Sequence, residues 1–130
     1  MATLTAKQAN DLGKDFLALA QAIGDFRYDN WNTLSKEDNQ RLSDFQWSIL
    51  NYGEDILALS VILVMDDVEA SLTKINTISS KIKGTIQVLK NIQKGIDVAA
   101  AIVTLGAAII SKSPKVIADS IDGLVKSWDS

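Results

Sequence analysis

The sequence contains no cysteine and no histidine, and proline occurs once, at Pro114. Without cysteine the chain has no disulfide, no thiolate nucleophile and no sulfur ligand, and without histidine it lacks the commonest general base and nitrogen ligand. The scarcity of proline favours long uninterrupted helices. We therefore predict a protein that is not an enzyme and that uses no cofactor.

Oxygen ligands for magnesium or calcium are still available in the acidic group Asp66, Asp67 and Glu69. This group lacks the ligand spacing and the glycine that an EF-hand loop requires. We interpret it as a solvated acidic turn of a helix and predict no metal site.

The N-terminal segment Met1 to Lys7 has no basic stretch followed by an apolar core and a small-residue cleavage site. It therefore shows no secretory signal. We expect a soluble cytoplasmic protein or one that is exported without a signal peptide, and the absence of cysteine agrees with either compartment.

A length of 130 residues and an apolar content of 47% fit one domain with its own hydrophobic core. Thr5 and Gln8 form a capping box that starts a first helix near Ala6. Its apolar residues recur every three or four positions, as in the buried stripe of an α-helix: Leu12, Phe16, Leu19, Ile23 and Phe26. After a turn over residues 28–33, Ser35 caps a second helix with an inner face of Leu42, Phe45, Ile49 and Tyr52. Gly53 is expected to kink or end this helix.

Residues 56–65 are apolar except for Ser60, and we predict a buried helix there, because no second run of strand character can pair with them. A seam of apolar residues with helical spacing then runs into the uncharged segment 98–110: Val68, Leu72, Ile75, Ile82, Ile86, Leu89 and Ile96. Ser113 and Pro114 start a last helix that buries Ile117, Ile121, Leu124 and Trp128. The predicted fold is an all-α bundle of four to five helices over residues 1–130, with a long central helix and a C-terminal helical hairpin.

Charge is distributed unevenly along the chain. Residues 1–70 carry five basic and twelve acidic side chains, and residues 71–130 carry eight basic and four acidic ones, which gives −7 and +4. Lys83, Lys90 and Lys94 are contact candidates: they either face the acidic half of the chain or bind an anionic membrane, at about 1 kcal/mol per lysine. We predict no nucleic-acid binding, because the chain is acidic overall and its lysines are not interleaved with arginine or aromatic residues.

Gly84, Gly95 and Gly106 are eleven residues apart, close to three helical turns, and therefore lie near one face of the predicted long helix. Glycine costs about 1 kcal/mol relative to alanine inside a helix, so this face indicates either the close approach of another backbone or three tolerated kinks. The further contact candidates are small and apolar: Gly95, Ala99, Ile102, Leu105, Gly106, Ile109 and Ile110. The expected partner is a second copy of the chain or another helical protein.

The uncharged segment 98–110 has thirteen residues, about 20 Å of helix, whereas a bilayer core is about 30 Å thick. It is too short for an ordinary spanning helix. It is either an arm that is packed in a soluble bundle and released into lipid later, or the most buried helix of the core.

A lysine-bearing helix, the Ala/Gly/Val/Ile segment 98–110, the turn 111–114 and an amphipathic helix follow one another in the C-terminal half. Over about residues 68–128 this order resembles the hydrophobic-hairpin region of α-helical pore-forming haemolysins and enterotoxins. The resemblance implies a hairpin that is active on membranes.

We therefore expect a non-enzymatic bundle that works by helix-mediated assembly, with the membrane activity that the resemblance implies. The alternative is a soluble protein-interaction module, such as an adaptor, an inhibitor or an immunity-type protein, in which residues 98–110 stay in the core. A third hypothesis is a bundle that carries a lipid in an interior lined by alanine and glycine.

Overall fold

The computed structural model describes residues 2–3, 5–59, 64–65, 68–85, 92–111 and 113–129. Five helices make up most of this part of the chain: α1 (Ala6–Asp29), α2 (Lys36–Leu59), α3 (Val68–Thr85), α4 (Ile92–Ser111) and α5 (Pro114–Asp129). Two short strands, β1 (Ala2–Thr3) and β2 (Val64–Met65), pair in antiparallel orientation. The prediction of an all-α bundle is confirmed.

The start of α1 is the predicted capping box. The backbone N–H of Gln8 donates to the Thr5 hydroxyl at 3.1 Å, and the Thr5 N–H donates to the Gln8 side-chain oxygen at 2.9 Å. α2 starts with Ser35, whose hydroxyl accepts the N–H of Asp38 at 3.1 Å. Each cap satisfies an N–H group that has no partner inside its own helix, so both predicted helix starts are confirmed.

Replacing Thr5 with alanine should lower the free energy of unfolding by about 1 kcal/mol, because the substitution removes the cap. Urea denaturation followed by circular dichroism measures this change. Thr104→Ala is the matched control, since this exposed hydroxyl donates to the Ala100 carbonyl inside α4 at 3.1 Å and caps no helix end. The control should change stability by less than about 0.5 kcal/mol. Equal losses in the two variants would contradict the capping role of Thr5.

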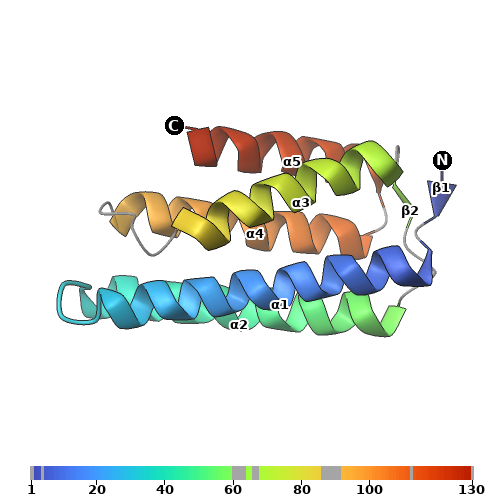
Figure 1. Ribbon diagram of the computed structural model, residues 1–130. Helices are drawn as coiled ribbons and strands as arrows, with labels where there is room; N and C mark the ends of the chain where they lie inside the picture. The colour runs from blue at the N-terminus through green and yellow to red at the C-terminus, as the bar shows by residue number, and fades with distance from the viewer. Residues whose placement is uncertain are drawn as a thin grey trace.

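The five helices lie side by side along one direction (Figure 1), and their contacts connect them in a ring in the order α1, α2, α4, α5 and α3. α1 and α2 make one antiparallel hairpin, and α4 and α5 make the predicted C-terminal hairpin. Apolar side chains from all five helices fill the ring, among them Phe16 and Phe26 of α1, Ile49 of α2, Ile75 of α3, Ile102 of α4 and Ile121 of α5. α4 packs mainly between α2 and α5 and contributes one face to the apolar core.

The predicted inner faces of the first, second and last helices lie in this core. The residues predicted for α1 are all buried, Phe45 and Tyr52 of α2 are partly buried, and Ile117, Ile121 and Leu124 of α5 are buried. The side chain of Trp128 lies outside the described part of the chain.

α1 and α2 approach closely where two glycines face each other. A Cβ atom built on Gly13 would lie 3.1 Å from the carbonyl oxygen of Gly53, and one built on Gly53 would lie 3.1 Å from that of Gly13. α2 continues through Gly53 to Leu59, so this glycine does not end the helix. Its role is to let two backbones approach each other.

The predicted long central helix is wrong, because α3 and α4 are separate helices. Figure 1 shows α3 ending and α4 beginning at the same end of the bundle, so the chain reverses between them. One helix over residues 68–110 would be about 65 Å long, whereas the 24 residues of α1 extend about 36 Å. The reversal brings the apolar faces of both α3 and α4 to one core. The side chains of the seam residues Ile82, Ile86 and Leu89 lie outside the described part.

The predicted helix over residues 56–65 is correct only for its first turn. α2 ends at Leu59, and Val64 and Met65 form β2, which pairs with Thr3 and Ala2 of β1. The strand partner comes from the N-terminus, in a segment too short to show strand periodicity in the sequence. Residues 60–63 lie outside the described ranges.

Candidate functional site in helix α4

α4 is longer than the uncharged segment that the sequence singles out. Its 20 residues extend about 30 Å, which is the thickness of a bilayer core. Within the described ranges it is the one helix that is long and apolar enough to cross a membrane, by length and composition. Half of its most apolar stretch is buried inside the bundle, and the core helix of a soluble protein meets the same two criteria. The length of about 20 Å predicted from segment 98–110 is therefore shorter than the helix that contains this segment.

The two faces of α4 differ in exposure. Four of the predicted contact residues, Ala99, Ile102, Leu105 and Ile109, are at most 1% exposed, and Ile110 is partly buried. The outer stripe is made of small and polar residues: Gln93, Asp97, Thr104, Ala107 and Ser111. Lipid or a partner can reach the apolar face only after α4 has separated from its neighbours.

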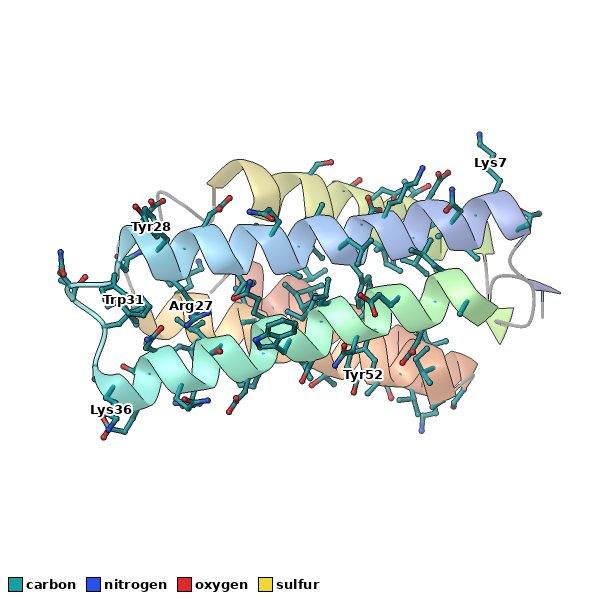
Figure 2. The ribbon with its side chains drawn as sticks, turned by 90° about the horizontal axis from the view of Figure 1, so that it is seen from below. Lys7, Arg27, Tyr28, Trp31, Lys36 and Tyr52 are labelled. Atoms are coloured by element: carbon teal, nitrogen blue, oxygen red, sulfur yellow. The ribbon has the colours of Figure 1, made fainter. Side chains whose placement is uncertain are left out.

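Gly95 and Gly106 accommodate aromatic rings from the first hairpin. A Cβ atom on Gly95 would lie 2.7 Å from Cε1 and Cζ of Phe26. A Cβ atom on Gly106 would lie 2.6 Å from Cδ2 of Tyr52 and 2.9 Å from Cε2 of Phe16. Packed carbon atoms are normally about 3.5–4.0 Å apart, so only glycine fits at both positions without movement of the rings. Figure 2 shows Tyr52 on α2, the helix that packs against α4.

Close neighbours are thus present at Gly95 and Gly106, but they are aromatic rings of the same chain and not the backbone that the sequence suggested. Gly84 belongs to α3, a different helix, so the three glycines do not share one face as the sequence suggested. The apolar contact candidates of α4 are core residues of the closed bundle. A second copy of the chain is not needed to cover them.

Two of the lysine candidates, Lys83 and Lys94, lie at the end of the bundle where α4 begins. Lys94 is the third residue of α4 and is partly buried. Lys83 lies in the last turn of α3, at the same end (Figure 1). The side chain of Lys83 and the whole of Lys90 are outside the described part of the chain.

An aromatic tip, which we define as Tyr28 and Trp31, stands at this end: Tyr28 lies in the last turn of α1 and Trp31 in the connection between α1 and α2. Tyr28 is 81% exposed and Trp31 is 59% exposed. Figure 2 shows both at the end of the hairpin that lies opposite Lys7. Sequence reasoning missed the tip as a functional feature. The available signal was that both residues follow Phe26, the last member of the buried stripe, and stand beside asparagines at the end of the periodic pattern.

A groove of about 570 Å³ runs between α4 and α5 on the outer surface. Small residues and two aspartates line it: Asp97, Ala100, Ala101, Thr104, Val116, Asp119, Ser120, Gly123 and Ser127. A Cβ atom on Gly123 would have no atom of another residue within 4 Å, apart from its chain neighbours and the backbone of its own helix, so the groove is open there. Because the groove lies outside the helix ring, it does not provide the interior that a lipid carrier would need.

No group of three or more acidic side chains lies close enough to hold a metal ion, as far as the described residues extend. Comparison with known protein families, with curated proteins and with solved structures finds no match to this chain. The fold therefore defines an all-α bundle in which one of the helices has membrane-spanning length, with an acidic groove beside that helix and an aromatic tip at the end where it begins.

Proposed function

We propose that this protein is a non-enzymatic bundle that keeps α4 soluble by packing it in the core and delivers it to a membrane, where several copies assemble. The observation that carries the proposal is α4 itself, which combines 20 residues of spanning length with an apolar face covered by other helices. In water the neighbouring helices cover this face. In a bilayer, lipid tails or α4 helices of other copies would replace them.

The charges of the C-terminal hairpin fit this transfer. Lys94 and Asp97 lie in the first two turns of α4, and no charged residue follows before its end at Ser111. α5 is amphipathic, with Ile117, Ile121 and Leu124 buried on one side and charged residues such as Asp122 exposed on the other. A helix of this kind lies in the interface plane of a membrane. We propose that α4 crosses the bilayer while α5 stays at its surface.

The proposal that several copies assemble follows from the single helix per chain, within the described residues, that is long and apolar enough to span a membrane. One α4 per chain cannot enclose a channel, so a pore would need α4 helices from several copies. This supports the expectation of a homo-oligomer on the membrane, while the closed bundle buries its own apolar residues. Lys83 and Lys94 lie at the end where α4 begins and would favour anionic lipid there, and Lys90 adds a third positive charge in the sequence between them.

The groove between α4 and α5 supports a second candidate function, a soluble module that binds a helical partner. Asp97 and Asp119 line the groove and favour a partner with basic side chains. In this alternative α4 stays in the core. Its exposed residues Asp97 and Thr104 already line the groove, so a partner can bind without any movement of α4.

Release of a trapped dye from vesicles that contain anionic lipid separates the two functions. We expect the wild-type chain to release dye at low salt, and we expect the combined variant Lys83→Gln, Lys90→Gln and Lys94→Gln to bind more weakly while keeping its helix content. Salt should weaken the wild-type binding in the same way, because the Debye length falls to about 8 Å at physiological ionic strength. If the wild type neither binds nor permeabilises vesicles at acid or neutral pH, the soluble module becomes the better hypothesis.

A further inference from the structure

The aromatic tip is held by a hydrogen-bonded turn built around Asn30. The Asn30 carbonyl oxygen accepts the backbone N–H groups of Thr33 and Leu34, each at 2.9 Å, and the Thr33 hydroxyl at 3.0 Å. The Asn30 side-chain amide donates to the Phe26 carbonyl at 2.9 Å. These bonds fix the turn, so its aromatic side chains are presented from an ordered base.

Arg27 ties the two helices together directly behind the tip. Its Nε donates to Oδ1 of Asn39 at 3.0 Å, and its Nη1 donates to Oε1 of Gln46 at 2.9 Å. Both bonds are partly buried, and Leu34 packs against the core beside them. The base of the tip is therefore preorganised, and binding through the rings would require little further ordering of the chain.

The area and shape of the tip suit a lipid surface better than a protein. Two aromatic side chains bury about 150–250 Å² each, which together is below the ~800 Å² that each partner contributes to a stable protein interface. The rings also stand on the convex end of a hairpin. Tyrosine and tryptophan place their amphipathic rings at the head-group level of bilayers, which needs no matching concave partner.

The residues of the tip segment carry no net positive charge. Residues 27–38 contain two basic residues, Arg27 and Lys36, and three acidic ones, Asp29, Glu37 and Asp38, which gives a net charge of −1. This segment does not itself attract an anionic surface, although Lys83 and Lys94 lie at the same end of the bundle. Binding through the tip therefore depends on the rings, and a zwitterionic bilayer separates their contribution from that of the lysines.

The tip also lies next to the start of α4. Phe26, two residues before Tyr28, occupies the space beside Gly95 in the first turn of α4, with 2.7 Å between its ring atoms and a Cβ built there. Figure 1 shows the turn between α1 and α2 and the beginning of α4 at the same end of the bundle. A membrane that holds the tip would be close to the end of α4 that carries Lys94.

We propose that Tyr28 and Trp31 anchor the closed bundle end-on in the head-group layer of a zwitterionic bilayer. The proposal rests on the membrane function proposed above and adds the docking step that precedes the release of α4. The rings enter the interface first, while α4 is still in the core. Docking then needs neither anionic lipid nor the lysines.

Tryptophan fluorescence tests this orientation, because the chain offers a matched pair of reporters. Trp31 at the tip is 59% exposed, and Trp47 on the side of α2 is 60% exposed. One variant keeps only Trp31 (Trp47→Phe, Trp128→Phe) and the other keeps only Trp47 (Trp31→Phe, Trp128→Phe). On addition of phosphatidylcholine vesicles, Trp31 emission should shift to the blue and become shielded from acrylamide, while Trp47 emission stays unchanged. Circular dichroism checks that both variants keep the helix content of the wild type.

Binding measurements complete the test. Tyr28→Ala and Trp31→Ala together should weaken the affinity for phosphatidylcholine vesicles by about tenfold or more, since two rings lose their burial in lipid. Trp47→Ala is the control and should bind like the wild type. High salt should leave the wild-type affinity for these vesicles unchanged.

Three results would overturn the aromatic anchor: an equal shift of both tryptophans, no shift of Trp31, or binding that requires anionic lipid and disappears at high salt. Failure of the anchor and failure of the proposed function are distinguishable. Dye release without a change at Trp31 would retain the function of α4 and reject the anchor. A change at Trp31 without dye release under any lipid composition would retain the anchor and reject delivery of α4.

Discussion

Replacing Gly106 with alanine should destabilise the bundle by about 1–3 kcal/mol, although alanine is the better helix former by about 1 kcal/mol. The added methyl group would lie 2.6 Å from Cδ2 and 2.8 Å from Cγ of Tyr52 and 2.9 Å from Cε2 of Phe16. These are ring atoms, and one of the rings is fully buried, so α4 must move away from α1 and α2. Urea denaturation measures the loss as a lower midpoint.

The same substitution at Gly123 is the control with the opposite expected sign. A Cβ atom there meets nothing within 4 Å, so Gly123→Ala should gain about 0.5–1 kcal/mol from helix propensity alone. Combining Gly106→Ala with Tyr52→Leu should give a loss smaller than the sum of the single losses, because the smaller side chain makes room for the methyl group. A Gly106→Ala variant as stable as Gly123→Ala would show that α4 is not packed against these rings.

Replacing Ala107 with aspartate should reduce dye release about tenfold or more. Ala107 is exposed on the outer stripe of α4, so a carboxylate there stays hydrated in the closed bundle and costs little stability. An aspartate at the centre of a spanning helix costs about 2.5–3.5 kcal/mol. The native Asp97 lies about 7 Å along the axis on one side of the middle of α4, and position 107 lies about 8 Å on the other side, so the variant adds a second carboxylate to the spanning stretch. The exposed site separates the effect on insertion from the effect on folding. Ala101 does not allow this separation, because it is partly buried against the core.

Ala118→Asp is the matched control for this experiment. Ala118 is an exposed alanine in the same hairpin, on α5, and its replacement changes the net charge by the same amount. If α5 stays at the membrane surface, this variant should release dye like the wild type. Equal losses in the two variants would show that net charge, and not the crossing of α4, limits the release.

Dye release should change in opposite directions in the two central variants. Gly106→Ala loosens the packing of α4, so dye release should become faster than in the wild type if separation from the core limits it. Ala107→Asp leaves the packing intact and should slow release. A soluble module would show neither effect, because its function never requires α4 to move.

Local sequence signals determined the beginnings of the helices and their buried faces. Thr5 with Gln8, and Ser35 with Asp38, are capping interactions between residues three apart, so nothing distant is needed to predict them. The apolar stripe from Leu12 to Phe26 is likewise set by the period of the helix. Composition and periodicity together were enough to predict an all-α bundle with a C-terminal hairpin.

Tertiary structure decided where the chain reverses and which side chains are packed against a neighbouring helix or exposed to solvent. The seam after Val68 has helical spacing on both sides of the reversal, and only the need to bury both faces in one core separates α3 from α4. Val64 and Met65 form a strand because the N-terminal residues reach them, a contact across more than sixty positions that periodicity does not register. The exposure of Tyr28 and Trp31 and the rings beside Gly95 and Gly106 depend on how α1, α2 and α4 pack. Burial depends on neighbours that are distant in the chain, which is why the sequence alone determined the starts of α1 and α2 and the apolar stripe of α1 but neither the separation of α3 from α4 nor the site.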